Sequence, residues 1–333
     1  MAELISVIVT AYRRRQYLGE SLRSVLSQTL DRRSYEVVVV SDFEPGMADL
    51  KGISWVYDDQ EGVGEKVRKG FVETRGGIVC LLDDDDMFRG DKLERVISMF
   101  RDLRPLYYHN SFVTVDERGN EIRLTKDYLK VPPYASLNPP EFTLTLEDAP
   151  LTRIRNLLKL NANFNSSSIC VRREVLEASL DYLKRVKAVV DSFLFYSSIT
   201  QKGRVLLDPE RLTYYRIHKL QTSSGNSNGL AEYRESLSRL FLKAYEDMLI
   251  VREMSKGISK ELDEVIEEEI ERYRLLYKLF SGKSLHGTFK PRLLKYYILA
   301  GLPSFFKNFF IKEQYKRRAN PSFSYARPQI KPS

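Results

Sequence analysis

Residues 78–86 are an apolar run that passes directly into four acidic residues, Ile78-Val79-Cys80-Leu81-Leu82-Asp83-Asp84-Asp85-Asp86. The apolar run predicts a buried strand, which puts the aspartates at its carboxyl end. Neighbouring carboxylates repel one another, so we expect a cation beside them. Hard divalent ions such as Mg²⁺ and Mn²⁺ take carboxylate oxygens and often share them with substrate phosphates. The alternative is a solvated acidic loop with an aspartate cap for a helix that begins near Asp91.

Strands and helices alternate around this run. Buried strands are predicted at 4–10, 36–40, 53–56 and 78–82, and helices at 16–28 and 66–73. This alternation favours an α/β fold with a mostly parallel sheet that helices cover on both faces. Ligands of such folds bind at the carboxyl ends of the strands. Three polar groups are expected there, namely Thr10-Ala11-Tyr12, Ser41-Asp42 and the four aspartates.

The chain up to residue 229 predicts further elements of the same unit. Strands are expected at 107–115, 121–124, 165–171, 205–207 and 213–216, and helices at 91–101, 172–183 and 188–200. The segment Asp116-Glu117-Arg118-Gly119-Asn120 is typical of a hairpin turn. Residues 131–150 carry five prolines and predict an irregular loop near the acceptor side of a cleft. The Ser/Asn/Gly-rich stretch 221–229 predicts a domain boundary.

Helical patterns dominate after residue 230. Helices are predicted at 231–256 and 260–280, and the apolar stripe of the second favours packing on the chain's own domain or on a second subunit of a homodimer. Residues 293–311 are apolar and aromatic, but Pro303 and Lys307 make them a poor transmembrane helix. Two interpretations stay open for this segment, an amphipathic segment at a membrane interface or a helix packed on protein.

The net charge of the chain is +8, and its basic excess lies in the tail. Residues 281–333 hold eleven Lys or Arg against one acid, Glu313, so residues 1–280 are slightly acidic. A basic tail with bulky apolar residues suits anionic lipid, whereas nucleic-acid binding calls for basic and aromatic residues interleaved on a folded surface. The charge pattern of residues 281–333 therefore fits peripheral contact with a membrane, which is one of the two interpretations left open above, and we expect no binding of nucleic acid.

Length and composition predict a globular protein. The 333 residues are 43% hydrophobic, which is enough for one large domain with an appendage or for two domains. Cys80 and Cys170 lie in apolar, strand-like segments without a CxxC pair, so both are predicted to be reduced core residues. The first eleven residues lack the basic region and the long apolar stretch of a signal peptide. We therefore expect a cytoplasmic protein, with its tail on the inner face of the cell membrane.

Taken together, the motifs resemble those of family 2 glycosyltransferases of the GT-A fold, over about residues 5–224. In chain order they are Ser6-Val7-Ile8-Val9-Thr10-Ala11-Tyr12-Arg13-Arg14-Arg15-Gln16-Tyr17-Leu18, Tyr35-Glu36-Val37-Val38-Val39-Val40-Ser41-Asp42, Leu82-Asp83-Asp84-Asp85-Asp86, Val190-Asp191-Ser192-Phe193-Leu194 and Tyr214-Tyr215-Arg216-Ile217-His218. The resemblance implies a Rossmann-like mixed sheet flanked by helices. Residues 1–225 would form the transferase domain, with a nucleotide-binding half at 1–115 and an acceptor half at 116–225. Residues 230–333 would form a helical extension.

The resemblance also implies a reaction, an inverting transfer of a sugar from a nucleotide diphosphate to an acceptor hydroxyl. The expected donor is a UDP-, GDP- or dTDP-sugar, and the expected acceptor is a saccharide or a lipid-linked saccharide. Asp191 is the candidate general base on the acceptor side. A cation at the leaving diphosphate would stabilise the charge that gathers there.

The candidate ligands follow from the same motifs. For Mn²⁺ or Mg²⁺ they are Asp85 first, then Asp83 or Asp84, with His218 as a further contact. For the nucleotide sugar they are Thr10, Tyr12, Asp42, Lys66, Arg68, Asp83 and Asp84. After Asp42 the family often continues with Gly and Ser or Thr, whereas this chain has Phe43-Glu44-Pro45-Gly46, so the contacts to base and ribose are expected to differ.

Two other functions share part of this pattern. A nucleotidylyltransferase would have a similar sheet and metal carboxylates, but it would begin with a Gly-rich phosphate loop, and residues 10–18 hold no glycine. A non-catalytic scaffold that binds nucleotide sugars would be expected to have lost carboxylates, and all of them are present. Purely structural roles also exist for single residues, because Asp191 would suit a helix N-terminus and His218 would suit a structural position in an aromatic strand.

Overall fold

The computed structural model describes residues 3–45, 52–124, 151–201, 203–218, 229–283, 285–319 and 323–325. Its strands are β1 (Ile5–Ala11), β2 (Tyr35–Ser41), β3 (Ser54–Tyr57), β4 (Ile78–Asp83), β5 (Met87–Phe88), β6 (Tyr107–Val115), β7 (Ile122–Leu124), β8 (Ile169–Arg172), β9 (Val205–Arg216) and β10 (Phe323–Tyr325). Its α-helices are α1 (Leu18–Leu26), α2 (Val63–Val72), α3 (Lys92–Leu103), α4 (Leu151–Lys159), α5 (Arg173–Glu177), α6 (Leu180–Leu183), α7 (Val190–Thr200), α8 (Leu230–Ser255), α9 (Lys260–Ser281), α10 (Leu294–Gly301) and α11 (Ser304–Ala319).

Eight strands form one sheet in the order β3-β2-β1-β4-β8-β6-β9-β5. The pairs β3–β2, β2–β1 and β1–β4 are parallel, whereas β8 runs antiparallel to both of its neighbours. The predicted mostly parallel α/β sheet is thereby confirmed. β1 and β4 lie side by side in a register that pairs Thr10 with Asp83. Their carboxyl ends therefore bring the first motif and the aspartate run together.

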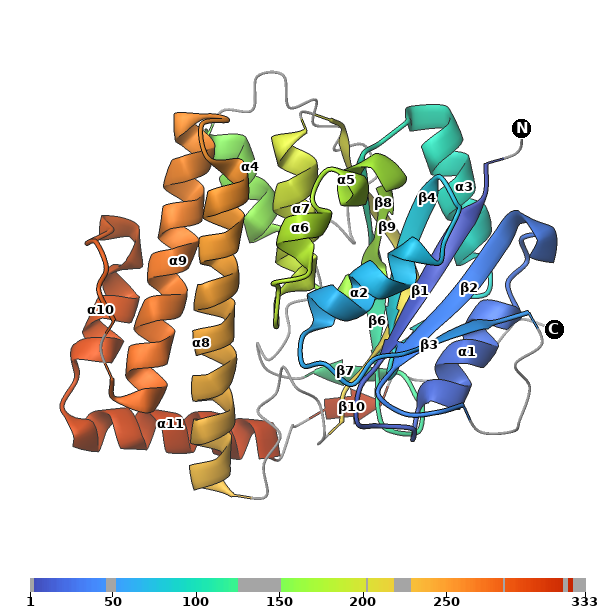
Figure 1. Ribbon diagram of the computed structural model, residues 1–333. Coiled ribbons are helices and arrows are strands. Elements are labelled where there is room, and N and C mark those ends of the chain that lie inside the picture. The colour runs from blue at the N-terminus through green and yellow to red at the C-terminus, as the bar shows by residue number, and fades with distance from the viewer. Residues whose placement is uncertain are drawn as a thin grey trace.

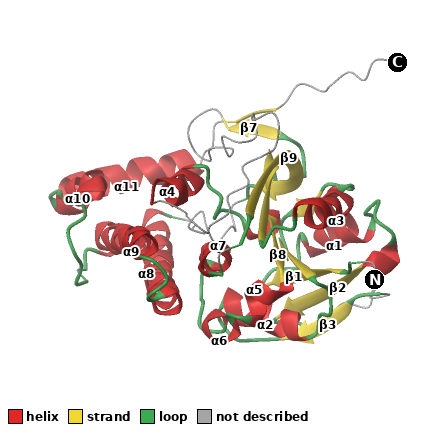
Figure 2. Cartoon of the chain, turned by 90° about the horizontal axis from the view of Figure 1, so that it is seen from above, coloured by secondary structure: helices red, strands yellow, loops and turns green. Residues whose placement is uncertain are grey.

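Helices cover both faces of the sheet (Figures 1 and 2). On one face, α1 and α3 pack on β1, β2 and β4 through buried residues that include Val25, Leu93 and Phe100. On the other face lie α2 and α4–α7. Burial on both faces explains the uninterrupted apolar sequences of the central strands, where residues 5, 7, 8 and 9 are 0% exposed.

The long helices α8 and α9 lie beside one another, and α8 packs against α7 while α9 packs against α4 (Figure 1). Met248 and Val251 of α8 and Val265 and Ile266 of α9 belong to the buried cluster that also holds Ile8 of β1. The apolar stripe predicted from the sequence is thus buried against the chain's own body, which was one of its two expected partners. Burial of one such aliphatic side chain stabilises the fold by roughly 1.5–3 kcal/mol.

The aromatic segment near the C-terminus is divided into two helices. α10 ends at Gly301 and α11 begins at Ser304, because Pro303 between them lacks the backbone N–H that would continue the first helix. Ile311 of α11 is buried with Tyr233 of α8, so α11 is anchored on the long helices. Within the described ranges, the model contains no helix with both the length and the hydropathy needed to cross a bilayer.

Several predicted elements have different limits in the structure. The two short strands expected at 205–207 and 213–216 are one strand, β9, which follows β6 with a shift in register. The helix expected at 172–183 is divided into α5 and α6, and the strand expected at 165–171 begins only at Ile169, after a 3-10 turn. The proline-rich segment 131–150 and most of the predicted boundary at 221–229 lie outside the described residues.

The prediction that both cysteines are reduced is wrong, because the structure joins Cys80 and Cys170 by a disulfide. The error has a topological cause. β8 is inserted antiparallel next to β4, and the register places these two residues directly opposite each other, with their Cα atoms 4.1 Å apart. In the sequence, the two cysteines lie in separate apolar segments 90 residues apart. These segments become neighbours only through the order of the strands in the sheet.

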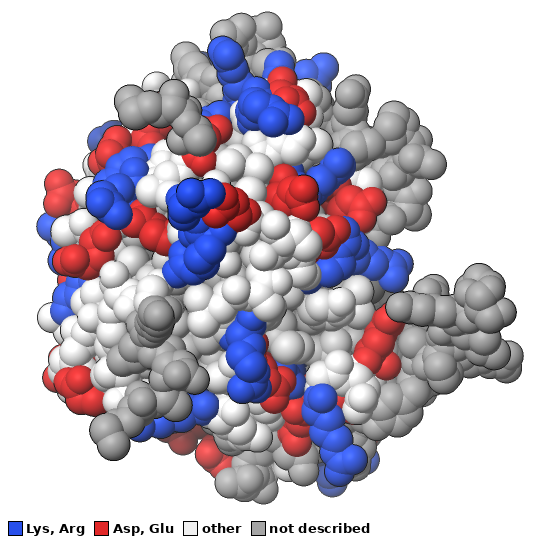
Figure 3. Space-filling view, turned by 90° about the vertical axis from the view of Figure 1, so that its right-hand side faces the viewer, with Lys and Arg blue, Asp and Glu red and all other residues white. Residues whose placement is uncertain are grey.

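Surface charges lie close to charges of the opposite sign. Arg33 contacts Asp31 at 2.8 Å and Arg101 contacts Asp102 at 2.9 Å, both largely exposed to solvent. Figure 3 shows acidic and basic side chains interspersed on the face toward α1 and α3. Such exposed pairs each contribute only about 0–1 kcal/mol to stability. They fit the near-neutral charge of residues 1–280.

Candidate active site

A cleft of about 490 Å³ opens where β1 and β4 end. Its walls come from the residues after β1, the start of α2, the 3-10 turn at 166–168, the start of α7 and one face of α8. The lining residues are Thr10, Tyr12, Arg14, Glu61, Gly62, Val63, Lys66, Asp83, Asp84, Asp85, Phe164, Asn165, Ser166, Lys187, Ala188, Val190, Asp191, Tyr215, Ser236, Arg239, Leu240 and Lys243. The cleft therefore contains the predicted residues of the opening motif, the aspartate run and the acidic motif of α7.

Asp83 ends β4 and is held by hydroxyl groups on both sides. Its Oδ1 accepts a hydrogen bond from Thr10 Oγ1 at 3.2 Å, and its Oδ2 accepts one from Ser166 Oγ at 2.6 Å. Burial and the neighbouring charge of Asp85 raise the pKa of Asp83 to about 6. Its position thus disfavours the ionised form unless a positive charge is close by.

The next two aspartates share one arginine. The guanidinium of Arg14 lies 2.7 Å from Asp84 Oδ1 and 2.9 Å from Asp85 Oδ2. His218 Nε2 also lies 2.9 Å from Asp85 Oδ2. Burial, followed by the charge of Asp85, raises the pKa of Asp84 to about 7. Burial would also raise the pKa of Asp85, but the hydrogen bond from His218 and the charge of Arg14 outweigh it, so this pKa is lowered.

Asp86 completes a group of carboxylates that fits a metal ion. Asp83, Asp85 and Asp86 each offer an oxygen, and these oxygens lie within 4.8 Å of one another. Asp86 is 1% exposed, and its Oδ2 and that of Asp84 find no hydrogen-bond donor in the described part of the chain. Oxygen ligands of this kind suit Mg²⁺ or Mn²⁺. Of the predicted ligands, His218 touches the group through Asp85, whereas Asp86 was not predicted.

A buried lysine supports the floor of the cleft. Lys92 at the start of α3 is 0% exposed, and its Nζ donates to the Ser167 carbonyl at 2.5 Å and to Thr213 Oγ1 at 3.1 Å. Ser167 Oγ in turn accepts the backbone N–H of Asp83 at 3.0 Å. Burial holds the pKa of Lys92 well below its usual range. Lys92 therefore fixes the turn that contacts the first aspartate.

Asp191 faces the same cleft from the first turn of α7. Its Oδ1 accepts the backbone N–H of Ser192 at 2.8 Å, and its Oδ2 accepts that of Asn165 at 3.2 Å. Burial raises the pKa of Asp191 to about 7, with a further contribution from the charge of Asp83, although the two N–H groups oppose the shift. Asp191 thus makes the contact at a helix N-terminus that its structural interpretation predicts. It also lines the cleft, and its raised pKa suits a general base.

The predicted nucleotide-contacting residues do not all reach the cleft. Tyr12 lines it, and Lys66 Nζ lies 5.3 Å from the centre of the Tyr12 ring while pairing with the buried Asp58. Asp42 accepts the backbone N–H of Arg13 at 2.9 Å and so contacts the loop that carries Tyr12. Arg68 does not enter the cleft, because it pairs with Glu65 and lines a different hollow beside α6.

Several cleft residues were not predicted. Arg14 lies within the opening motif but was given no role, because nothing in the run Arg13-Arg14-Arg15 distinguishes it from its neighbours. Arg239 and Lys243 come from α8, in the region predicted to be an appendage. Their spacing of four residues places them on one face of the helix, which was a usable indication only once α8 was known to pack on the domain that holds the sheet.

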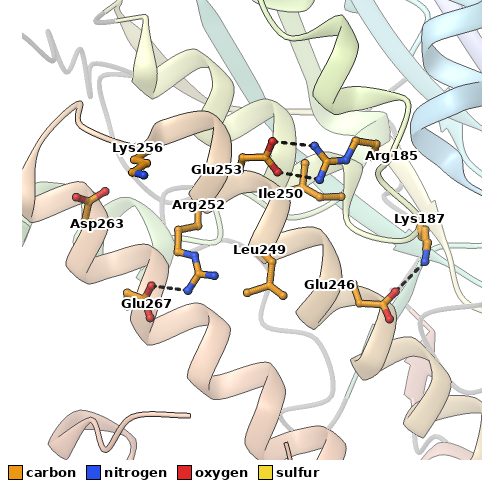
Figure 4. Close-up of a pocket in the computed structure, with 10 residues that line it drawn as sticks. All are labelled: Arg185, Lys187, Glu246, Leu249, Ile250, Arg252, Glu253, Lys256, Asp263 and Glu267. Carbon is orange, nitrogen blue, oxygen red and sulfur yellow. Dashed lines mark hydrogen bonds and ion pairs between the residues drawn. The ribbon is translucent and has the colours of Figure 1, made fainter. Parts of the chain in front are cut away.

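A larger hollow of about 790 Å³ lies between residues 185–187, α8 and α9 (Figure 4). Its charges pair with one another: Arg185 with Glu253 at 2.8 Å, Lys187 with Glu246 at 2.8 Å and Arg252 with Glu267 at 3.1 Å. These exposed pairs balance locally, so the hollow offers no concentrated charge to a ligand. Its walls matter for another reason, because they join α8 to the segment that leads into α7.

Asp247 of α8 makes that junction. It is 0% exposed, and its carboxylate accepts three backbone N–H groups, from Lys187 at 2.8 Å, Ala188 at 2.7 Å and Val189 at 3.0 Å. α7 begins at the next residue, and Asp191 is its second residue. α8 therefore fixes the start of the helix that carries Asp191.

Family comparison agrees with this site. The family model described as Glycosyl transferase family 2 matches residues 6–180 of the 333. Because this match covers more than half of the sequence, the chain belongs to glycosyl transferase family 2. The matched range contains the ends of β1, β2 and β4, and it stops short of α7 and α8, which complete the cleft.

Individual relatives are distant. An uncharacterized glycosyltransferase of Nostoc sp. is 28% identical over 232 residues, 64% of this chain and 65% of that protein. One of Rickettsia prowazekii is 22% identical over 298 residues, 86% of this chain and 87% of that protein. One of Rickettsia bellii is 28% identical over 123 residues, which are 34% of this chain and only 18% of that protein. The match thus spans less than two thirds of the Nostoc and Rickettsia bellii proteins.

Solved structures share the architecture. The crystal structure of S. aureus TarS 1-349 in complex with UDP-GlcNAc has a TM-score of 0.50 and 13% identity, and the match covers 99% of this chain and 98% of that chain. At this identity the likeness concerns the fold alone. Together with the family match, it identifies the curled sheet and its flanking helices as a GT-A type fold.

The Asp247 contacts generate a prediction about stability. Asp247→Ala leaves three N–H groups without their acceptor, so we expect it to lower the free energy of unfolding by about 2–4 kcal/mol in urea denaturation. Glu246→Ala is the matched control, because Glu246 contacts the same segment only through its exposed pair with Lys187 and should cost less than about 1 kcal/mol. Equal losses for the two variants would contradict the anchoring role of Asp247.

Proposed function

We propose that this chain is an inverting glycosyltransferase that moves a sugar from a nucleotide-diphosphate sugar to an acceptor hydroxyl. The observation that carries the proposal is that one cleft is lined by Asp83 and Asp85, two members of a carboxylate group fit for a divalent cation, and by a separate carboxyl, Asp191, with a pKa of about 7. Inverting transfer needs these two functions in one cavity, one for the leaving diphosphate and one for the attacking hydroxyl.

In this proposal Asp191 acts on the acceptor. Its carboxylate takes the proton of the acceptor hydroxyl while the hydroxyl oxygen forms a bond to the anomeric carbon of the sugar. The bond from that carbon to the diphosphate oxygen breaks at the same time, and the nucleoside diphosphate leaves with the electron pair. Asp83, Asp85 and Asp86 would hold Mg²⁺ or Mn²⁺, which would stabilise the charge on the leaving group. The proton remains on Asp191 until the product has left.

The nucleotide would bind at the loop after β1. Thr10 and Tyr12 line this part of the cleft, and Lys66 lies next to the Tyr12 ring. Asp42 would act from the adjacent strand end. The donors we propose are UDP-, GDP- or dTDP-sugars, and the acceptor is a saccharide or lipid-linked saccharide in glycan synthesis.

Donor binding is the first test. We expect a thermal-shift screen of UDP, GDP, dTDP and their sugars to identify one nucleotide that stabilises the protein. At a concentration of about 100 times its Kd, and with Mn²⁺ present, this nucleotide should raise Tm by about 4–8 °C. Asp85→Asn should abolish the Mn²⁺-dependent part, whereas Asp102→Asn, at an exposed position on α3, should keep it. A wild-type protein that no nucleotide stabilises would refute a nucleotide-sugar donor.

Asp191 gives a prediction about pH. Slow hydrolysis of the donor, with water as acceptor, should rise about tenfold per pH unit below pH 7 and level off above it, because only the ionised carboxylate accepts a proton. Asp191→Asn should lower this rate about 10²–10⁴-fold and leave donor binding intact, as judged by the same thermal shift. An unchanged rate in this variant would remove Asp191 from the reaction.

We also propose peripheral contact of the cytoplasmic enzyme with a membrane through residues 281–333. On α11, Phe305 and Phe309 are 75% and 61% exposed, and Lys312 and Lys316 are also exposed. Spacings of four and seven residues place these side chains on one face of the helix, opposite the anchored Ile311. Aromatic rings beside lysines suit the boundary between acyl chains and anionic headgroups. A homodimer through the C-terminal helices remains a second proposal for this region.

The membrane proposal predicts the behaviour of a double variant. Phe305→Ser/Phe309→Ser should lower co-sedimentation with vesicles of phosphatidylcholine and phosphatidylserine at least threefold, because it removes the apolar contact but leaves the lysines. Val72→Ser, which changes an exposed apolar residue on α2, serves as the control. Unchanged co-sedimentation of the double variant would contradict a membrane role for α11.

A further inference from the structure

Three consecutive arginines follow β1, and their side chains diverge. Arg13 lies over the Tyr12 ring at 4.7 Å and is 3.9 Å from Glu61. Arg15 lies over the Phe43 ring at 4.5 Å. Arg14 alone of the three lines the cleft and reaches the aspartates. All three arginines carry the same charge, so the backbone conformation must determine which of their side chains enters the cleft.

The backbone of Arg13 makes this selection. Its φ is +57°, in the left-handed region that costs a residue with a side chain roughly 1–2 kcal/mol. The hydrogen bond from its N–H to Asp42 Oδ1 at 2.9 Å helps to hold this conformation. The turn of the chain at Arg13 sends the following side chain back over the ends of β1 and β4. A strained residue kept beside a cleft is typical of a functional position.

Arg14 contacts one of the carboxylates that a metal ion would need. Its guanidinium is 2.9 Å from Asp85 Oδ2, and Asp85 is one of the three carboxylates that fit a cation. The side chain of Arg14 is 20% exposed, so water screens it only partly. Asp84 and Asp86, on either side of Asp85, each keep a buried oxygen without a hydrogen-bond donor in the described part of the chain.

We propose that Arg14 is an internal counter-cation, which a divalent ion displaces from Asp85 and which then binds the diphosphate of the donor. The inference rests on the proposed function, because it takes a nucleotide-diphosphate donor as the second partner of Arg14. Electrostatics favours displacement, since two cations on one carboxylate repel each other more strongly in a cleft than in bulk water. A guanidinium is suited to the second partner, because it donates two parallel hydrogen bonds to phosphate oxygens.

This exchange couples the two ligands. Without a donor, the metal must compete with Arg14 for Asp85. With the donor present, the diphosphate gives Arg14 a new partner, so the metal binds more easily. By thermodynamic reciprocity the metal also frees Arg14 for the diphosphate. Without ligands, Arg14 therefore partly neutralises the aspartates. The arrangement with the metal ion on the aspartates and Arg14 on the diphosphate forms only when both ligands are present.

The test is the affinity of Mn²⁺ for nucleotide-free protein, measured by isothermal calorimetry. We expect Arg14→Gln to bind Mn²⁺ about tenfold more tightly than the wild type, because the competitor is gone. Arg15→Gln, which removes the same charge one residue away, should match the wild type. In the presence of the nucleoside diphosphate, the gain in Mn²⁺ affinity should be smaller for Arg14→Gln than for the wild type. Equal or weaker binding of Mn²⁺ to nucleotide-free Arg14→Gln would overturn the proposal.

A second measurement uses the wild type alone, in case Arg14→Gln does not fold. In a crystal structure with Mn²⁺ and no nucleotide, the guanidinium should have left Asp85. A bound ion with the Arg14–Asp85 contact intact would overturn the displacement. Failure of the proposed function has a different outcome, since wild-type protein that binds neither Mn²⁺ nor any nucleotide would refute the donor site itself.

Discussion

The burial of three adjacent aspartates directly after β4 is the constraint on which the site depends. Asp84, Asp85 and Asp86 are only 3%, 7% and 1% exposed, and buried carboxylates are costly unless positive charge or donors surround them. The compensation comes from distant parts of the chain. Arg14 arrives from the loop after β1, and Arg216 and His218 arrive with the end of β9. Arg216 is itself fully buried, and it donates through Nε to the Asp85 carbonyl at 2.9 Å. The sheet order is thus also an electrostatic arrangement, because it brings two arginines and the His218 hydrogen bond to one strand end.

The sequence predicted the parts of this arrangement that are local. Uninterrupted apolar runs located β1, β2 and β4, and the rule that ligands bind at strand ends located Thr10, Asp83 and Asp85 correctly in one cleft. Contacts that depend on strand order were not predictable in the same way. β8 is inserted between β4 and β6, so the opposition of Cys80 to Cys170 follows from topology and from no local pattern. Arg14 was missed for a similar reason, since its role depends on the left-handed conformation of Arg13.

In the C-terminal helices, too, the apolar packing could be predicted from the sequence and the polar contacts could not. The apolar stripe of α9 predicted that the region packs on a body, and the stripe is buried there. The polar residues of α8 carried no comparable pattern. Arg239 and Lys243 line the cleft, and Asp247 holds the segment before α7. A helix predicted as an appendage therefore supplies both a wall of the cleft and the support of Asp191, beyond the residues that the family model covers.

The carboxyl groups of the cleft differ in ionisation because their partners differ. Burial tends to neutralise each of them, but Asp85 receives both a hydrogen bond from His218 and the charge of Arg14, so its pKa falls below the usual value. For Asp191, burial and the negative charge of Asp83 outweigh the backbone N–H groups that its carboxylate accepts, so its pKa rises to about 7. One carboxylate therefore stays ionised for a cation, and the other is ready to exchange a proton near neutral pH. Separation of proton affinities within one cavity is how a single residue type can serve two chemical roles. Here the separation comes from where each aspartate lies, Asp85 beyond a strand end beside basic side chains and Asp191 at a helix start beside backbone N–H groups.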